Sequence, residues 1–181
     1  MNKTTLIALG AIFLSLLSTA LADNQVTRKG EAPRPGKTPA VTVKALYDVG
    51  FFDQRHHIDQ LALKKLSACL SKELINHIEQ CNKKIKVWLT NDENEGLKLP
   101  ICEGSVCVSN YEGANTFEIG ESTIKRLHAE VPILLSYSEA GTTFRWVDVA
   151  ILRFVDGTWL LDDLLFDKRS STLRERLKLE Q

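Results

Sequence analysis

The chain has 181 residues, with 23 lysines and arginines against 23 aspartates and glutamates, so it is formally neutral. This balance argues against the basic surface that nucleic acids and anionic membranes attract, and we expect neither as a partner. The length suits a single domain with a substantial hydrophobic core.

The first 22 residues have the pattern of a secretory signal peptide. Lys3 supplies a positive charge, residues 6–17 form an apolar run, and Ala20-Leu21-Ala22 offers the small residues that a signal peptidase recognises. The run is shorter than the ~20 residues that span a bilayer, and no cysteine for lipid attachment lies near the cleavage point. We therefore expect cleavage after Ala22 and a periplasmic or secreted mature chain without a membrane anchor.

The mature chain contains four cysteines, and an even number in an exported protein favours two disulfides. The turn-forming residues between Cys102 and Cys107 favour that pair, which leaves Cys69 to pair with Cys81. The second pair requires a break between its members, because a continuous helix would hold them about 18 Å apart. The cysteine spacing does not match a zinc site, and we expect no metal and no cofactor.

Residues 23–40 contain three prolines and two glycines, which predicts a disordered linker before a single domain at 41–181. Apolar residues at helical spacing then predict three helices, with Ser71 as the N-cap of the third. The three stripes of apolar residues run over 43–51, 58–69 and 74–85.

Residues 91–121 are rich in polar residues and glycine, which predicts a long irregular segment with at most a short strand at Ile101 or Val106. Beyond it, apolar and polar residues alternate with period two. This alternation predicts three antiparallel strands, at 127–137, 143–155 and 158–166.

Individual residues in and after these strands predict turns, irregularities and a final helix. Asp156-Gly157 is a strong hairpin turn, and Pro132 favours an edge strand or a bulge. Thr172 and Glu175 match a capping box, which predicts a short closing helix. Helices followed by long antiparallel strands predict an α+β fold, with N-terminal helices packed on a curved antiparallel sheet.

The C-terminal sequence FVDGTWLLDDL at 154–164, followed by TLRERL at 172–177, resembles the ending of a family of small exported bacterial proteins of unknown function. That family lies in the nuclear-transport-factor-like superfamily, also called the ketosteroid-isomerase or cystatin-like cone fold. The resemblance implies a cone with a pocket at its open end. It leaves the function open, because the superfamily includes isomerases, dehydratases, hydrolases and plain binding modules.

Two aspartates are candidate catalytic bases. Asp148 is predicted to share a strand face with Trp146 and Ala150, where an apolar environment would raise the pKa of its carboxyl. Asp163 is the second candidate, because neighbouring Asp162 and Asp163 point to opposite sheet faces. Single carboxylates in strands are more commonly structural, so neither residue by itself defines a catalytic site.

Four other residues are candidate binding residues. Arg145 and Arg153 share a predicted strand face, where they are candidates either to hold an anionic ligand or to cover the sheet with their stems. Trp88 and Tyr111 are candidate aromatic anchors for a protein partner. The adjacent histidines His56 and His57 do not have the spacing of a metal site, and we interpret them as part of a loop.

The sequence therefore favours a periplasmic, non-enzymatic module that binds a protein partner. One version of this hypothesis is an immunity protein that neutralises a toxin delivered into the periplasm. The first alternative is a small-molecule binder, or an isomerase- or hydrolase-like enzyme that uses the cone pocket. The second is a structural subunit of the envelope, which would form homo-oligomers such as a homodimer.

Overall fold

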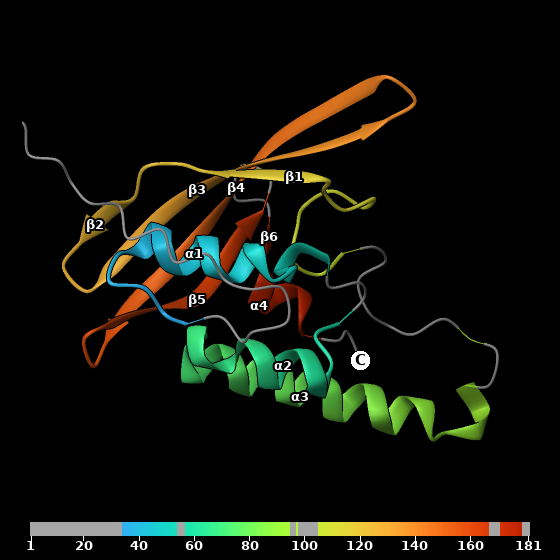
Figure 1. The fold of residues 1–181 in the computed structure, drawn as a ribbon. Coiled ribbons are helices and arrows are strands. Elements are labelled where there is room, and N and C mark those ends of the chain that lie inside the picture. The colour runs from blue at the N-terminus through green and yellow to red at the C-terminus, as the bar shows by residue number, and fades with distance from the viewer. Residues whose placement is uncertain (1–33, 54–56, 95–96, 98–104, 167–170, 179–181) are drawn as a thin grey trace, which may run out of the picture.

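The structure is a computed structural model that describes residues 34–53, 57–94, 97, 105–166 and 171–178. Helices come first, a six-stranded antiparallel sheet follows, and a short helix comes last (Figure 1), which confirms the α+β prediction. The elements are α1 (Pro39–Asp48), η1 (Phe51–Asp53), α2 (Gln60–Leu66), η2 (Ser67–Cys69), α3 (Lys72–Leu89), η3 (Asp92–Asn94), β1 (Thr116–Ile119), β2 (Thr123–Lys125), β3 (His128–Glu139), β4 (Thr142–Val155), β5 (Thr158–Phe166), β6 (Ser171–Thr172) and α4 (Leu173–Arg176).

The sheet is open and curved, with the strand order β1-β3-β4-β5-β6, and β2 also pairs with β3. Both long hairpins turn on two residues with positive φ. These are Ala140 (48°) and Gly141 (83°) between β3 and β4, and Asp156 (48°) and Gly157 (83°) between β4 and β5. The second pair confirms the predicted turn, and glycine is the residue that takes this conformation at least cost.

Of the two places expected for Pro132, the edge strand is wrong and the bulge is confirmed, because the three residues 120–122 lie opposite only two residues of β3, 131–132. Pro132 lies in β3, opposite Val149 of β4, with β1 and β2 both on the other side of β3. Proline is tolerated there because β1 ends at Ile119 and β2 begins at Thr123, so neither strand pairs with Pro132 itself. Gly120 donates its backbone N–H to the Pro132 carbonyl at 2.8 Å, and a Cβ on Gly120 would lie 2.8 Å from the proline ring.

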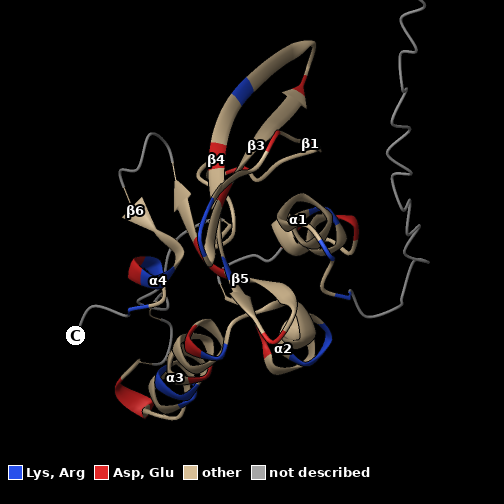
Figure 2. Ribbon diagram, turned by 90° about the vertical axis from the view of Figure 1, so that its left-hand side faces the viewer, with Lys and Arg blue, Asp and Glu red and all other residues tan. Residues whose placement is uncertain are grey.

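The helices lie on both sides of the sheet. Figure 2 shows α1 on one side and α4 on the other, with α2 and α3 below β5. α1 contacts β1, β3 and β5, whereas α3 and α4 contact β5. Alternate residues of β3 and β4 point into the hydrophobic core of the protein. These residues are fully or almost fully buried: Ala129, Val131, Ile133, Leu135, Asp148, Ala150 and Leu152.

The helix predictions hold with two local differences. Ser71 caps α3 as predicted, accepting the Leu74 N–H at 3.1 Å. α1 begins at Pro39, two residues before the expected start of the domain at residue 41, because Thr38 serves as its N-cap. Leu61, expected on an apolar stripe, is 64% exposed, and Leu63 is buried in its place.

Thr42 joins the first helix to the third long strand. Its fully buried hydroxyl donates to the Trp159 carbonyl at 3.0 Å and accepts the Gly36 N–H at 2.8 Å. The Thr42 side chain therefore provides the hydrogen bonds of the Gly36 N–H and the Trp159 carbonyl, which water cannot reach in this buried position.

Replacing Thr42 with valine is expected to lower the free energy of unfolding by about 2 kcal/mol, because it leaves a buried N–H and a buried C=O without a partner. Urea denaturation of both proteins measures the difference. The matched control is Thr123→Val on the exposed strand β2, which should change the stability by less than about 0.5 kcal/mol. Equal effects of the two substitutions would show that the Thr42 hydrogen bonds contribute nothing.

Candidate functional site

Asp148 is the most deeply buried charged residue that the structure describes, with no exposed surface. It lies on the core face of β4, as the alternation of the strand predicted. Its carboxylate accepts the Ser109 hydroxyl at 2.6 Å, the Ser109 N–H at 2.9 Å and the Trp146 indole N–H at 3.4 Å. These donors compensate the loss of water around the carboxylate, and they connect β4 to a segment 39 residues earlier in the chain.

That earlier segment, Ser105–Ser109, is here called the inner segment. Its first four residues are buried, although they belong to the stretch predicted to be a long irregular connection. The Ser105 hydroxyl donates to the Phe52 carbonyl at 3.1 Å, and Arg176 donates to the Val108 carbonyl at 2.6 Å. The guanidinium of Arg176 also lies 3.7 Å from the centre of the Phe166 ring. The inner segment is therefore held by η1, β4 and α4 together.

The prediction for residues 91–121 thus needs correction. The stretch contains the strand β1 and the buried inner segment, and Val106 is buried without belonging to a named strand. Ile101 lies outside the described residues. The period-two signal of β1 is only four residues long, and the burial of the inner segment depends on contacts with distant residues, so neither feature was readable from the sequence.

Tyr47 is a second buried polar group beside Asp148. Its hydroxyl has no hydrogen-bond partner among the described residues, and the side chain is almost completely buried. Burial raises the pKa of Tyr47 well above its usual value, and the neighbouring Asp148 and Cys107 raise it further. The hydroxyl therefore stays protonated and can donate a hydrogen bond in the core. Tyr47 belongs to the apolar helix stripe predicted for residues 43–51, and this pattern gave no sign of a functional role.

The expected Cys69–Cys81 disulfide is not present. Cys69, Cys81 and Cys107 are buried free thiols. The chain does break at Ser71, as this disulfide required, but Cys81 lies nine residues inside the continuous helix α3, about 14 Å along its axis from Lys72. The proposed partner of Cys107, Cys102, lies outside the described residues.

The buried thiols are expected to resist alkylation by iodoacetamide at pH 8 until the protein unfolds. Burial raises the pKa of Cys69 to about 12, so its reactive thiolate is scarce in the folded protein. The folded pKa is raised, so the stability from this group is present below the unfolded thiol pKa of about 8.5 and is lost as the pH rises toward 12. Mass spectrometry of protein alkylated with and without urea tests this, and labelling of Cys69 in the native protein would contradict it.

Asp163 is half-buried and connects β5 to α4. Its carboxylate accepts the Leu164 N–H at 2.8 Å and the Arg174 N–H at 3.1 Å. Burial raises the pKa of Asp163, and these backbone hydrogen bonds oppose that effect only in part. The geometry is that of a carboxylate stabilising the start of a short helix.

Asp162 lies at the centre of a charged network. It is 6% exposed and forms ion pairs with Arg174 at 2.6 Å and with Arg153 at 3.4 Å. Arg153 also pairs with Glu73 of α3 at 3.0 Å. The network therefore joins α3, β4, β5 and α4 by charge.

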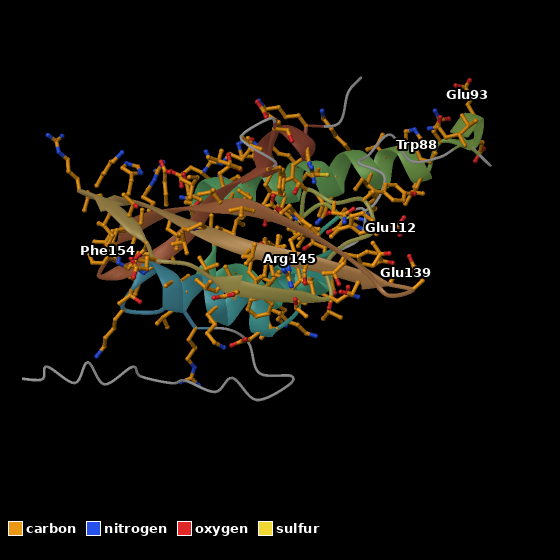
Figure 3. All side chains as sticks on the ribbon, turned by 90° about the horizontal axis from the view of Figure 1, so that it is seen from above. Trp88, Glu93, Glu112, Glu139, Arg145 and Phe154 are labelled. Carbon is orange, nitrogen blue, oxygen red and sulfur yellow. The ribbon has the colours of Figure 1, made fainter. Side chains whose placement is uncertain are left out.

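Arg145 and Arg153 do not form one anion site. They are eight residues apart on the same strand, about 26 Å at 3.3 Å per residue. Arg153 is engaged by the ion pairs above, whereas Arg145 is exposed, and no ion pair involving it is present among the described residues. Figure 3 shows the ends of β4, with Phe154 near one end and Glu139, in the opposite strand, near the other.

The end of the β3–β4 hairpin, residues 134–147, is here called the arm. β1 pairs with β3 only as far as Ser136, so the arm extends beyond the rest of the sheet (Figure 1). Its apolar side chains are exposed on both faces: Phe144 by 57% on the core-facing side, and Leu134 by 40% and Val147 by 46% on the other. Leu134 and Val147 lie directly opposite each other in the register.

The two predicted aromatic anchors lie on different elements. Trp88 is half-buried near the end of α3, and Figure 3 shows it apart from Arg145. Tyr111 is 60% exposed and follows Ser109, the residue that binds Asp148, by two positions. Tyr111 therefore lies two residues beyond the contact of the inner segment with β4, whereas Trp88 lies on α3. Of the adjacent histidines, His57 is half-buried and His56 lies outside the described residues.

Comparisons of this chain with protein-family models, with curated proteins and with solved structures found no match. Among the described residues, no helix combines the length and the apolar character needed to cross a membrane.

Proposed function

We propose that this chain is an exported, non-enzymatic module that binds a protein partner through the arm. The observation that carries the proposal is the exposure of Phe144, Leu134 and Val147 on the two faces of a projecting hairpin. Apolar side chains gathered on an exposed element are typical of interaction sites, and aromatic residues are enriched in the cores of such sites.

Two further observations support this proposal. Asp148, the leading candidate base, is engaged by Ser109 and Trp146, and Asp163 is engaged by backbone N–H groups. Both carboxylates therefore have structural partners that account for their positions. The signal peptide predicted for residues 1–22 supports a location outside the cytoplasm, where an immunity protein against a delivered toxin is one form that such a module takes.

Capture of partners by the immobilised mature chain tests the proposal. The variant Phe144→Ser/Val147→Ser should lose its partner, because it removes the most exposed apolar side chain from each face of the arm. The matched control is Leu61→Ser/Val87→Ser, which removes two side chains of similar exposure, 64% and 69%, from α2 and α3. The proposal fails if the arm variant and the control variant capture the same proteins, or if wild type captures none.

A second candidate function, binding of a small molecule in the core, is favoured by one observation. The Tyr47 hydroxyl is buried without a partner beside the Asp148 carboxylate, and a ligand oxygen could accept its hydrogen bond. Native mass spectrometry of the purified chain would detect a co-purified molecule. A ligand held by Tyr47 should be lost from Tyr47→Phe, and a molecule retained by that variant would exclude this role.

A further inference from the structure

The arm has an open backbone edge on β4. β5 pairs with β4 only from Val149 to Val155, and no described strand pairs with residues 142–147 on that side. Figure 1 shows the end of this hairpin standing clear of the other labelled elements. An unpaired edge presents a row of N–H and C=O groups that an additional strand can bind.

The turn geometry indicates which groups face outward. The two-residue turn at Ala140-Gly141 is closed by Glu139 and Thr142, which makes them a hydrogen-bonded pair. Hydrogen-bonded and non-hydrogen-bonded pairs alternate along an antiparallel ladder. The backbone groups of Thr143, Arg145 and Val147 therefore point to the open edge, and those of the residues between them bond to β3.

Observed contacts on the opposite strand agree with this alternation. Ser136, which lies opposite Arg145, directs its carbonyl away from β4 and accepts the Asn115 N–H at 2.8 Å. Ser138, which lies opposite Thr143, likewise donates its backbone N–H to the Asn115 side chain. Three N–H and three C=O groups on β4 are thus placed for an added strand.

Side chains along the edge define the chemistry of that strand. Phe144 and half-buried Trp146 lie on one face, and Arg145 lies between them on the other face, exposed and with no ion pair among the described residues. In an added antiparallel strand, opposite residues share a face. An acidic residue would therefore lie opposite Arg145, flanked by apolar residues opposite Phe144 and Trp146.

A second copy of this chain fits the edge poorly. Because opposite residues share a face, a twofold pairing must be centred on a residue. Centring on Arg145 sets two like charges directly opposite each other, which is destabilising. Centring on Phe144 or on Trp146 leaves a ladder of only about five residues, 142–146 or 144–148, because the turn or the pairing with β5 limits it. In these two registers Arg145 lies opposite Thr143 or Val147, so neither gives it an acidic partner.

We infer that the β4 edge of the arm binds an extended segment of the partner, with an acidic residue opposite Arg145 and an apolar residue on each side of it. The mode is addition of a strand to the sheet, in which main-chain hydrogen bonds give affinity and alternate side chains give specificity. This inference rests on the proposed function and names how the arm holds its partner.

The test uses the acetylated, amidated peptide Ser-Thr-Val-Glu-Val-Thr-Ser as the probe, titrated into the mature chain and followed by NMR. The amide signals of Thr143, Arg145 and Val147 should shift and gain protection from hydrogen exchange. Thr143→Pro removes one outward N–H but no backbone bond to β3, and should weaken binding about tenfold. Thr143→Ala retains the N–H and should change binding less than about threefold, and both variants lose the Thr143 hydroxyl contact with Ser138 of β3.

A charge reversal at Arg145 gives a second, independent test. Arg145→Glu should prefer the peptide in which lysine replaces glutamate, whereas wild type should prefer the original. If Thr143→Pro fails to fold, as judged by circular dichroism, this preference decides the inference.

Several results would overturn the inference. These are no binding of either peptide, equal binding by Thr143→Pro and Thr143→Ala, an unchanged charge preference, or a dimer in sedimentation that Thr143→Pro dissociates. If a captured partner depends on Phe144 and Val147 but binds Thr143→Pro normally, the proposed function stands and the inference about the edge is wrong.

Discussion

Replacing Asp148 with alanine is expected to lower the free energy of unfolding by about 3 kcal/mol. The carboxylate is fully buried and accepts two hydrogen bonds from Ser109 and one from Trp146. Its removal leaves these donors without an acceptor and detaches the inner segment from β4. Urea denaturation followed by tryptophan fluorescence measures the loss, because Trp146 is itself a contact.

The variant Ser109→Ala is the matched control. It removes the 2.6 Å hydroxyl contact but keeps the backbone N–H that donates at 2.9 Å, so we expect it to cost less, about 1 to 2 kcal/mol. If Asp148 were a catalytic carboxylate kept in an environment that destabilises the fold, Asp148→Ala would leave the stability unchanged or increase it. A loss below about 1 kcal/mol would thus revive the interpretation of Asp148 as a functional base.

Replacing Asp162 with alanine is expected to lower the free energy of unfolding by about 2 kcal/mol. Asp162 is 6% exposed and holds Arg174 and Arg153 together, and its removal leaves their charges close to each other. The expected loss of unfolding free energy is smaller than for a fully buried ion pair, because both arginine side chains retain contact with water.

The control for this prediction is Asp48→Ala. Asp48 pairs with Lys44 one turn away on α1 at 2.6 Å, a shorter contact than the Arg153–Asp162 pair, but Lys44 is largely exposed. We expect a loss below about 0.5 kcal/mol for this surface pair. Comparable losses at both sites, measured by thermal unfolding, would mean that burial of Asp162 adds nothing.

Much of the C-terminal half of the fold was predictable, and the errors have a common origin. The alternation over β3 and β4 identified the buried face correctly, including the position of Asp148, whereas a register shift in β5 moves burial from Trp159 and Leu161 to Asp162, Leu164 and Phe166. The bulge at Pro132 was predicted correctly and the edge position wrongly, because the pairing of β3 on both sides depends on how three strands assemble. The Cys69–Cys81 pairing was predicted by elimination, and the length of α3 after Ser71 overruled it.

The candidate site was predictable only in its strand positions. Sequence placed Asp148 on an apolar face, but its partner Ser109 lies 39 residues away in a stretch without periodicity. Arg145 and Arg153 share a face as predicted, yet only the ion pairs of Arg153 show that the two residues play different parts. The exposure of the arm depends on where β1 and β5 stop pairing with the hairpin.

The sequence by itself determined the features whose causes lie within a few residues. The Ser71 cap, the Thr172–Glu175 capping box, the Asp156-Gly157 turn and the two-residue period of the strands are all local in this sense. Tertiary structure alone decided the bond from Thr42 to Trp159, 117 residues apart, the burial of the inner segment and the open edge of β4. These features depend on contacts between distant segments, and their energies appear only when the chain has brought those segments together.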